Sequence, residues 1–257
     1  MAKLIVEDLK KTYFSSNGNG GNVIALQKIT FEIKEGEFVT VFGPNGCGKT
    51  TLIKVLAGIE SYESGEVLID NKPPKLSRTG VVFQDYGNSL MPWLRCKDNI
   101  LFPYRLNRRK SLRKDAEERL GEILSFLNIN LPLENFPYEL SGGQQQLIAL
   151  LRTLLYAPDV ILLDEPFSAL DINMRSLMQQ AIINIWEKVK STILFVSHDI
   201  EEAIFLADRI LLLTPLPAEV KDIKIVPFSR PRTIELFESR EFFDFKLECL
   251  HVIRNST

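Results

Sequence analysis

The segment Gly43–Thr50 has the glycines, the lysine and the hydroxyl group that can hold a nucleotide's phosphates, in the spacing G-x-x-x-x-G-K-[ST]. Its backbone N–H groups can turn toward phosphate oxygens, and a helix that begins there adds partial positive charge. Lys49 would reach the β and γ phosphates, and the Thr50 hydroxyl would bind Mg²⁺. Because an apolar run precedes the segment and a helical pattern follows it, we predict a phosphate site rather than a chance glycine-rich turn. The residues assigned to this loop are Gly43, Pro44, Asn45, Gly46, Cys47, Gly48, Lys49, Thr50 and Thr51.

A pair of carboxylates, Asp164 and Glu165, ends the apolar run Val160–Leu163. Asp164 would hold Mg²⁺ through water, and Glu165 would act as the general base that takes a proton from the attacking water. The alternative is that one of the two acids only caps the loop that follows. Together with the phosphate loop, the pair predicts a P-loop nucleoside triphosphatase and no narrower class.

A third segment, Leu140–Gln144, opens a helix with Ser141 as a suitable N-cap and two glycines after it. Such a helix start is a second anion site on the same chain. One phosphate cannot easily occupy two distant helix starts of one chain, so the segment suggests a second molecule docked head to tail. The residues assigned to this second site are Ser141, Gly142, Gly143 and Gln144.

The order and spacing of these motifs resemble those of the nucleotide-binding subunits of ATP-binding cassette (ABC) transporters. The matching stretches are GPNGCGKTT, Gln84, LSGGQQQ, ILLDEPFSALD and His198 in SHD, and they extend over residues ~3–213. The resemblance implies ATP and Mg²⁺ as cofactors, ATP hydrolysis as the activity, and a head-to-tail dimer of two ATPase subunits.

The resemblance also implies roles for single residues. Tyr13 would stack on adenine, and Gln84 would touch Mg²⁺ and sense the partner. His198 would contact the γ-phosphate, so that Glu165, His198 and Gln84 form the catalytic set. Ser141 and Gly143 would hold the γ-phosphate of the ATP bound to the other subunit, and Asp171 would cross the dimer interface. Thr50, Gln84 and Asp164 would be the metal ligands.

The elements that must position these residues follow from apolar patterning. The first ~40 residues read as strands around a hairpin loop at Ser15–Asn22. Short runs that are apolar throughout are typical of parallel strands covered on both faces, and they lie at 79–83, 159–164, 192–196 and 209–213. We therefore predict an α/β fold: a P-loop NTPase core with a mostly parallel sheet and an N-terminal antiparallel β subdomain.

Helical patterns are expected at Ser111–Leu127, Ser141–Tyr156, Asp171–Val189 and Ile200–Ala207. A helix after Gly43 would carry one apolar face made of Leu52, Val55, Leu56 and Ile59. Because residues ~88–156 hold helices without a strand between them, they suggest a helical subdomain inserted into a nucleotide-binding domain of residues 1–213.

The last segment, residues 214–257, is expected to be a short C-terminal tail packed on the body of the protein. Its packing face would be one helical stripe formed by Phe237, Phe242, Phe243 and Phe245. Regulation by this tail is the alternative to simple packing.

Composition excludes several other classes of protein. The 257 residues carry a formal net charge of −2, so no electrostatic footprint for nucleic acid is present. Cys47, Cys96 and Cys249 form neither a disulfide framework nor a metal-ligand spacing, which suits a reducing compartment. The N-terminus has no signal-peptide pattern, and no apolar run reaches the roughly 18 residues that cross a bilayer. We expect a peripheral protein on the cytoplasmic face of the cell membrane, held there by a partner.

One cysteine, Cys47, leaves two interpretations open. It lies inside the phosphate loop just before a helix N-terminus, where a reactive thiolate is favoured. The alternative is a small, inert filler.

The stretch Leu90–Leu94 is unusually apolar for a loop. In importers of the resembled family, the segment after the glutamine forms a groove for a short helix of the membrane subunit. We therefore assign Leu90–Leu94, with Trp93 as anchor, to docking of the permease; packing inside the helical subdomain is the alternative. A soluble ABC ATPase of DNA repair or translation is the competing class, but such proteins usually carry two cassettes or a long coiled coil.

Within importers, the chain resembles the nitrate/sulfonate/taurine group through MPWLRCKDNI, HDIEEAIFLADRI and SRPRTIEL. The implied substrate is a small anion, with bicarbonate also open, and an extracytoplasmic binding protein would deliver it. The sequence departs from the family after LSGGQQQ, where Leu147 and Leu151 replace an arginine and a small residue, while Arg152 matches. This departure puts the packing of that helix in question.

Overall fold

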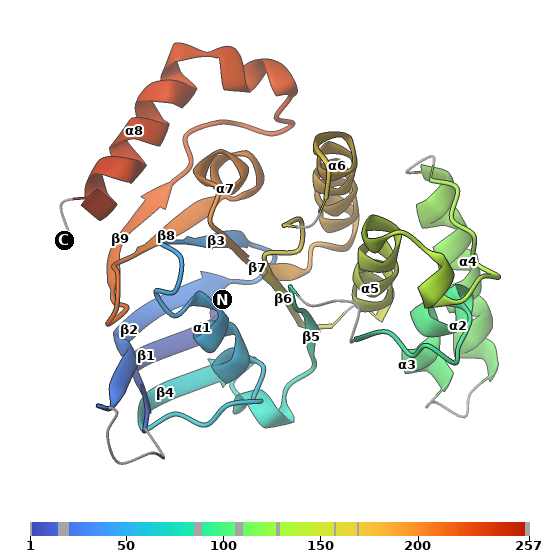
Figure 1. Cartoon of the computed structure of the whole chain (residues 1–257), viewed down its shortest axis with the longest axis horizontal. Coiled ribbons are helices and arrows are strands. Elements are labelled where there is room, and N and C mark those ends of the chain that lie inside the picture. The colour runs from blue at the N-terminus through green and yellow to red at the C-terminus, as the bar shows by residue number, and fades with distance from the viewer. Residues whose placement is uncertain are drawn as a thin grey trace.

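The computed structural model describes residues 2–14, 21–84, 89–105, 110–126, 129–156, 158–168 and 170–254. In these residues the strands form two sheets (Figure 1). The three-stranded sheet has the order β2-β1-β4, with β1 at Ala2–Tyr13, β2 at Val23–Lys34 and β4 at Ser64–Ile69. The six-stranded sheet has the order β5-β6-β7-β3-β8-β9. Its strands are β3 Phe38–Phe42, β5 Thr79–Val82, β6 Val160–Asp164, β7 Thr192–Ser197, β8 Arg209–Leu213 and β9 Val220–Ile225.

The three-stranded sheet is the predicted antiparallel β subdomain. β1 pairs with β2 from Ala2 opposite Lys34 to Tyr13 opposite Val23, and β4 pairs antiparallel on the other side of β1. The predicted hairpin loop at Ser15–Asn22 lies mostly outside the described residues.

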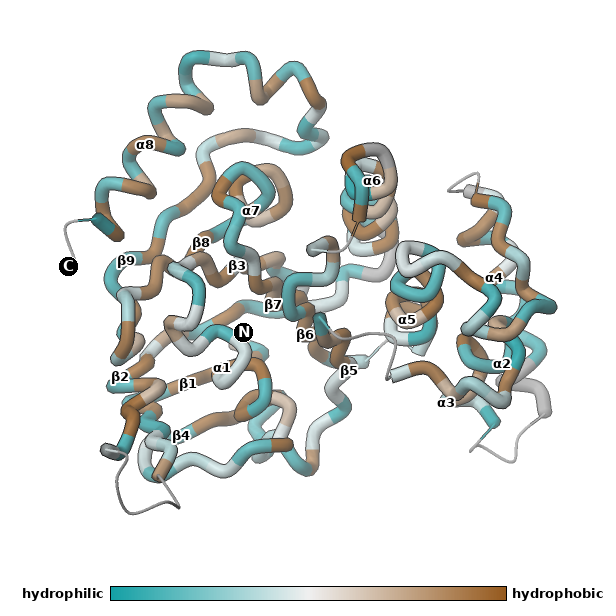
Figure 2. The backbone as a smooth tube through the Cα atoms, viewed as in Figure 1, coloured by the Kyte–Doolittle hydropathy of each residue, from teal (hydrophilic) through white to brown (hydrophobic). Residues whose placement is uncertain are grey.

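The six-stranded sheet is parallel except at β9, which runs antiparallel to β8. Every residue of β3, β6 and β7 is buried, as expected for parallel strands covered on both faces. The α/β fold class is therefore confirmed, and Figure 2 shows the hydrophobic residues concentrated in these central strands.

Helices cover both faces of the six-stranded sheet. Helix α1 (Lys49–Leu56) packs on one face together with the antiparallel sheet, in a core that joins Leu52, Val41 and Ile29. The opposite face is covered by α5 (Gly142–Tyr156), α6 (Ile172–Val189) and α7 (Ile200–Leu206). The ends of α5, α6 and α7 lie within one residue of their predicted bounds.

The segment between β5 and β6 contains helices and no strand within its described part. These helices are α2 (Cys96–Ile100), α3 (Phe102–Arg105), α4 (Lys110–Phe126) and α5, and α5 contacts the other three. Leu147 and Leu151 are fully buried in the core, so the two departures from the family pattern pack as apolar core residues.

The predicted apolar face of α1 is partly wrong. Ile59 is 61 % exposed because α1 ends at Leu56 and Gly58 takes a positive φ of 71°, so the chain leaves the helix before Ile59. The N–H groups of Ile59 and Gly58 donate to Lys54 and Val55 carbonyls, a Schellman ending.

The C-terminal tail packs on the body through β9, the 3₁₀ turn η4 (Ile234–Glu238) and α8 (Arg240–Arg254). Phe242 is buried and Phe237 stacks on Phe205 at 5.2 Å, but Phe243 is 54 % exposed. Phe243 therefore does not belong to the predicted packing face, because consecutive helical residues point about 100° apart.

An arginine of the tail ties it to α7. Arg232 is buried and donates hydrogen bonds to the carbonyls of Ile204, Phe205 and Ala207 at the end of α7, at 2.7–3.0 Å. These carbonyls lack helical partners, so the guanidinium completes the helix end. Burial lowers the pKa of Arg232 to about 10, and the side chain stays charged at neutral pH.

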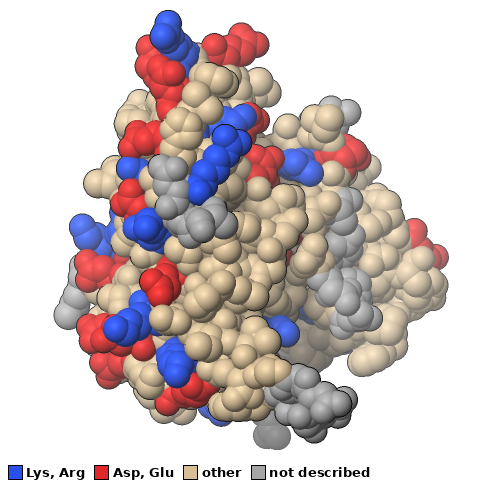
Figure 3. Space-filling view, turned by 60° about the vertical axis from the view of Figure 1, so that its left-hand side comes forward, with Lys and Arg blue, Asp and Glu red and all other residues tan. Residues whose placement is uncertain are grey.

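The surface carries charges of both signs. On the face drawn in Figure 3, Lys and Arg side chains lie among Asp and Glu without separating into areas of one sign. Among the helices of the described residues, none is long and apolar enough to cross a membrane.

Candidate nucleotide site

A cavity of about 480 Å³ lies at the carboxyl ends of the parallel strands. This is the edge of an open α/β sheet where ligands bind. Four separate segments supply its lining: the β3–α1 loop, the end of β5, the end of β6 and the end of β7. The lining residues are Asn45, Gly46, Gly48, Lys49, Thr50, Thr51, Gln84, Glu165 and His198. Residues predicted from motifs far apart in the sequence therefore share one cavity.

The phosphate loop is held in place by its own lysine. Lys49 is only 5 % exposed, and its Nζ donates to the carbonyls of Gly43 (2.9 Å) and Pro44 (3.0 Å). The loop also depends on Gly48, whose φ is +112° and where a Cβ would lie 2.8 Å from the Ala25 carbonyl oxygen. The ammonium group of Lys49 is thus held within the loop by two carbonyls of the loop itself.

Asp164 is buried beside the phosphate loop at the end of β6. Burial raises the pKa of its carboxyl, against a hydrogen bond with Thr50 and the charge of Lys49. Its Oδ1 has no hydrogen-bond partner among the described residues. A buried carboxylate oxygen without a partner, beside the Thr50 hydroxyl, is the kind of oxygen donor that Mg²⁺ prefers. Gln84, the third predicted ligand, lines the cavity together with Thr50, whereas Asp164 is not among its lining residues.

Glu165 lies between the lysine and the histidine. Its Oε1 is 3.8 Å from Lys49 Nζ, and its Oε2 is 2.8 Å from His198 Nδ1. The backbone of Glu165 has a φ of 47°, a conformation that non-glycine residues rarely adopt. The Glu165 side chain is 16 % exposed and faces the cavity, as a general base toward a bound water requires.

A buried acid that the sequence analysis missed, Glu202, lies next to Glu165 and His198. Glu202 on α7 accepts hydrogen bonds from Ser197 Oγ (2.5 Å) and Gln179 Nε2 (3.1 Å). With Glu165 and His198 it lines a second, water-sized cavity of about 20 Å³. Burial raises the pKa of Glu202. Its signal in the sequence was an acid within the apolar face of a helix that directly follows His198.

Tyr13 lies beside the site without lining the cavity. Its hydroxyl is 3.4 Å from Thr51 Oγ1, its side chain is partly exposed, and Lys11 Nζ lies 4.9 Å from its ring. The stacking of Tyr13 on adenine stays a prediction.

The predicted second site, Ser141–Gln144, lies apart from this cavity. The Ser141 N–H donates to Gln144 Oε1 (3.0 Å) and the Gln144 N–H donates to Ser141 Oγ (3.4 Å), which caps α5 reciprocally. Asp171 caps α6 by accepting from the Met174 N–H at 2.9 Å. None of these residues is among the residues that line the nucleotide cavity in the described structure.

The structure favours the inert-filler interpretation of Cys47 over the reactive thiol. The side chain is 1 % exposed, and its Sγ packs against the backbone of Gly43. Burial raises the pKa of the thiol, which outweighs the nearby charge of Lys49. The helix start favours a thiolate only where the sulfur is partly solvated.

The fold and the cavity together define an ATPase cassette of the P-loop class. Residues 26–168 match the family model described as ABC transporter, which is more than half of the chain. The chain belongs to the ABC transporter family, as one of its ATP-binding, ATP-hydrolysing components.

Known relatives agree with this assignment. An uncharacterised ABC transporter ATP-binding protein of Methanocaldococcus jannaschii is 40 % identical over 98 % of this chain and 92 % of its own length. The aliphatic sulfonates import ATP-binding protein of Bacillus cereus is 38 % identical over 88 % of each chain. The nitrate import ATP-binding protein of Synechococcus elongatus is 35 % identical over 90 % of this chain and 85 % of its own.

Solved structures show the same fold. The dimeric structure of a bacterial ABC transporter cassette has a TM-score of 0.74 and 30 % identity, and the match covers 88 % of this chain and 100 % of that one. A dimeric post-hydrolysis state of the same cassette, bound to ADP and Pi, gives the same TM-score at 29 % identity.

Proposed function

We propose that the chain is the ATP-hydrolysing subunit of an importer for a small anion. It would work as a dimer beneath permease subunits, peripheral to the cytoplasmic face of the membrane. The single observation that carries the ATPase part is the cavity that unites Lys49, Glu165 and His198. The relatives named for aliphatic sulfonate import are 38–40 % identical to this chain and the nitrate relative 35 %, so an organic sulfonate is the first substrate class and nitrate the second.

The proposed chemistry assigns one task to each group of the site. Lys49 neutralises the β and γ phosphates, and the Glu165 carboxylate takes the proton of the attacking water. His198, hydrogen-bonded to Glu165, orients this carboxylate and reaches the γ-phosphate. Mg²⁺, held by Thr50, Asp164 and Gln84, would neutralise charge that develops on the phosphate oxygens.

A head-to-tail dimer is the arrangement that the capped start of α5 favours. Residues 141–144 are not among the residues that line the described cavity of their own chain, but a second chain's γ-phosphate would meet the backbone N–H groups at this helix start. The dimeric cassette with a TM-score of 0.74 supports this proposal.

The proposed permease contact centres on Trp93. This side chain is 72 % exposed, whereas Leu90 is buried in the core and drops out of the predicted docking stretch. Asn99, fully buried, fixes the intervening loop: its Oδ1 accepts from the Met91 N–H (2.8 Å), and its Nδ2 donates to the carbonyls of Met91 and Leu94 (3.0 Å each). An exposed indole on a fixed loop favours a waiting partner, because little entropy remains to be lost on docking.

The substitution Glu165→Gln tests the ATPase proposal. The amide cannot accept the water's proton, so turnover should fall by about 10²–10⁴-fold while ATP binding persists. With ATP present, the variant should then elute as a dimer in size-exclusion chromatography. Turnover near the wild-type rate would contradict the role of Glu165, and a persistent monomer at high ATP would contradict the head-to-tail dimer.

The substrate class needs the assembled importer. The chain would be purified with its permease in lipid vesicles, and ATPase stimulation by the loaded binding protein measured with an aliphatic sulfonate, with nitrate and with bicarbonate. Stimulation by the sulfonate is the expected result. Stimulation by none of the three anions would overturn the anion proposal, and stimulation by nitrate or bicarbonate without the sulfonate would overturn the sulfonate as first substrate class.

A further inference from the structure

An isoleucine stands almost fully in solvent at a place where the proposed dimer would form. Ile172 is 82 % exposed, directly after Asp171 and at the first position of α6. Burial of such an apolar side chain against another surface would stabilise the contact between the two surfaces.

The same chain has a matching groove on its nucleotide face. A cavity of about 320 Å³ lies between the phosphate loop residues 42–45, His198 and the C-terminal end of α8, which contributes Leu250, Ile253 and Arg254. Its walls are mainly the apolar side chains of Phe42, Pro44, Leu250 and Ile253. In Figure 1, α8 runs along α7 to end beside β9, and this course brings a part of the tail to the nucleotide face.

Two observations within one chain predict where the isoleucine and the groove would lie in a head-to-tail dimer. Leu170 packs directly beside Gly143, since a Cβ added to Gly143 would lie 2.9 Å from Leu170 Cδ2. The segment that ends in Ile172 is therefore positioned against the start of α5. Asn45 and His198 line both the nucleotide cavity and the groove, so the groove adjoins the phosphates. When the α5 start of one copy meets the phosphates of the other, its residues 170–172 come to the edge of the groove.

We propose that Ile172 of each copy enters the groove between the phosphate loop and α8 of the other copy when ATP closes the dimer. This rests on the head-to-tail dimer of the proposed function. The occupant is a second copy of this chain, because the groove is continuous with the cavity that the dimer covers and because an exposed apolar side chain of suitable size lies on the segment that would approach it.

The proposal gives the tail a place in the nucleotide cycle. Lys246 on α8 pairs with Glu201 on α7 (2.5 Å), and Lys224 on β9 pairs with Glu248 on α8 (2.7 Å). Helix α8 is therefore tied to α7, the helix that follows His198, and α8 forms one wall of the dimer contact instead of only covering the core.

Cross-linking tests the contact directly. Ile172→Cys would be combined with Leu250→Cys or Ile253→Cys in the Glu165→Gln background and treated with a short bismaleimide. The native cysteines Cys47, Cys96 and Cys249 are buried and should stay silent. We expect a cross-linked dimer with ATP and none with ADP or with either single cysteine. A matched control pairs Ile172→Cys with Ile225→Cys, which is 74 % exposed on β9 and away from the groove, and should not cross-link.

A second set of variants tests the contact without relying on the cross-linking reaction. Ile172→Ser should leave the melting temperature of the monomer unchanged because the side chain is exposed, yet weaken ATP-dependent dimerisation about tenfold. Ile253→Ser should weaken it similarly, and the double variant should lose less than the product of the two because both remove one contact.

The outcomes separate the two proposals. A dimer that forms with ATP at wild-type affinity in Ile172→Ser, without cross-links in the paired variants, overturns the groove contact and leaves the head-to-tail dimer standing. Chromatography that shows no ATP-dependent dimer of the Glu165→Gln parent removes both. Cross-links that form equally with ADP would show a contact independent of nucleotide and overturn the inference as stated.

Discussion

The two tryptophans of this chain occupy opposite environments. Trp186 on α6 is 5 % exposed, and Trp93, on the loop before α2, is 72 % exposed. Residue type is the same, so the difference lies in what surrounds each ring. One tryptophan holds the fold together, and the other is available to a partner.

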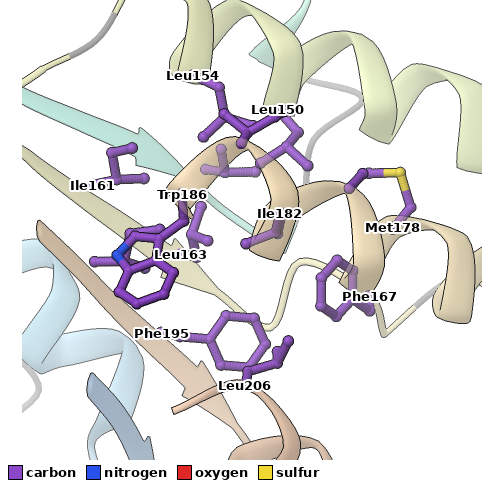
Figure 4. Close-up of a cluster of buried hydrophobic side chains, with 14 of the residues drawn as sticks. Leu150, Leu154, Ile161, Leu163, Phe167, Met178, Ile182, Trp186, Phe195 and Leu206 are labelled. Carbon is purple, nitrogen blue, oxygen red and sulfur yellow. The ribbon is translucent and has the colours of Figure 1, made fainter. Parts of the chain in front are cut away.

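The surroundings of Trp186 are those of a core residue. Its ring meets Phe38 edge-on at 5.9 Å and belongs to the cluster with Leu163, Ile182 and Phe195 drawn in Figure 4. Arg230 of the tail covers one side at 4.4 Å from the ring centre and Lys190 lies at 4.8 Å. The tail therefore helps to close the core over this residue.

Trp93 is exposed on a backbone that is nevertheless well held. The Asn99 side chain fixes Met91 and Leu94 on either side of it, and Arg152 anchors the preceding Ser89 carbonyl at 2.8 Å. Exposure here does not result from a loose chain end. The comparison teaches that a rigid exposed aromatic and a buried one can be told apart only by their surroundings.

The largest effect on stability is expected from substitution of the buried tryptophan, Trp186. Trp186→Ala should lower the free energy of unfolding by about 3–5 kcal/mol, because it leaves a large cavity in the core. Urea denaturation of the isolated chain measures this loss. Trp186→Phe is the matched control and should recover much of the stability. A loss below about 1 kcal/mol for the alanine variant would contradict the assignment of Trp186 to the core.

A smaller effect, on docking to the permease and not on folding, is expected from substitution of the exposed tryptophan, Trp93. Trp93→Ala should change the free energy of unfolding by no more than about 0.5 kcal/mol, as for other surface substitutions. Docking to the permease should weaken by about 2 kcal/mol, since a buried tryptophan is a frequent interface hot spot. Co-purification with the permease and the melting temperature of the isolated chain measure the two quantities.

Trp93→Phe, which keeps an apolar ring, serves as the control for Trp93→Ala. If the alanine variant melts far below the wild type, Trp93 is a core residue and the docking assignment falls. If it melts normally and still co-purifies at wild-type strength, the partner does not use this side chain.

The sequence was sufficient where the structure is local. The phosphate loop, the acid pair and the α5 cap are each set by neighbouring residues, so motif and flanking pattern predicted them, and the parallel sheet followed from its wholly apolar strands. It was insufficient where the answer depends on distant packing. Leu90 is buried in a core cluster most of whose members come from later in the chain, and Glu202 accepts hydrogen bonds from Ser197 and from Gln179 on another helix.

The tail illustrates the same limit. A stripe of phenylalanines is visible in the sequence, but Phe243 faces solvent because the body of the protein meets only one side of α8. The hydrogen bonds of Arg232 to the end of α7 depend on a chain reversal that no local pattern marks.

The smallest effect is expected from thiol reagents at Cys47. This residue tests whether surroundings decide the behaviour of a side chain, as they do for the two tryptophans. If surroundings decide behaviour, this cysteine should be inert although it lies in the chemically most active loop. Burial raises its pKa above the usual 9.0, so the thiolate, which is the reactive form, is scarce at neutral pH and becomes populated only as the pH rises beyond that value. Native protein at pH 7.5 should show almost no alkylation by iodoacetamide at Cys47, and ATPase activity should stay unchanged. Ile59→Cys, at a position that is 61 % exposed, is the control and should react rapidly. Fast modification of native Cys47 that ATP prevents would mean that the loop opens to solvent, and the static burial would then no longer predict its chemistry.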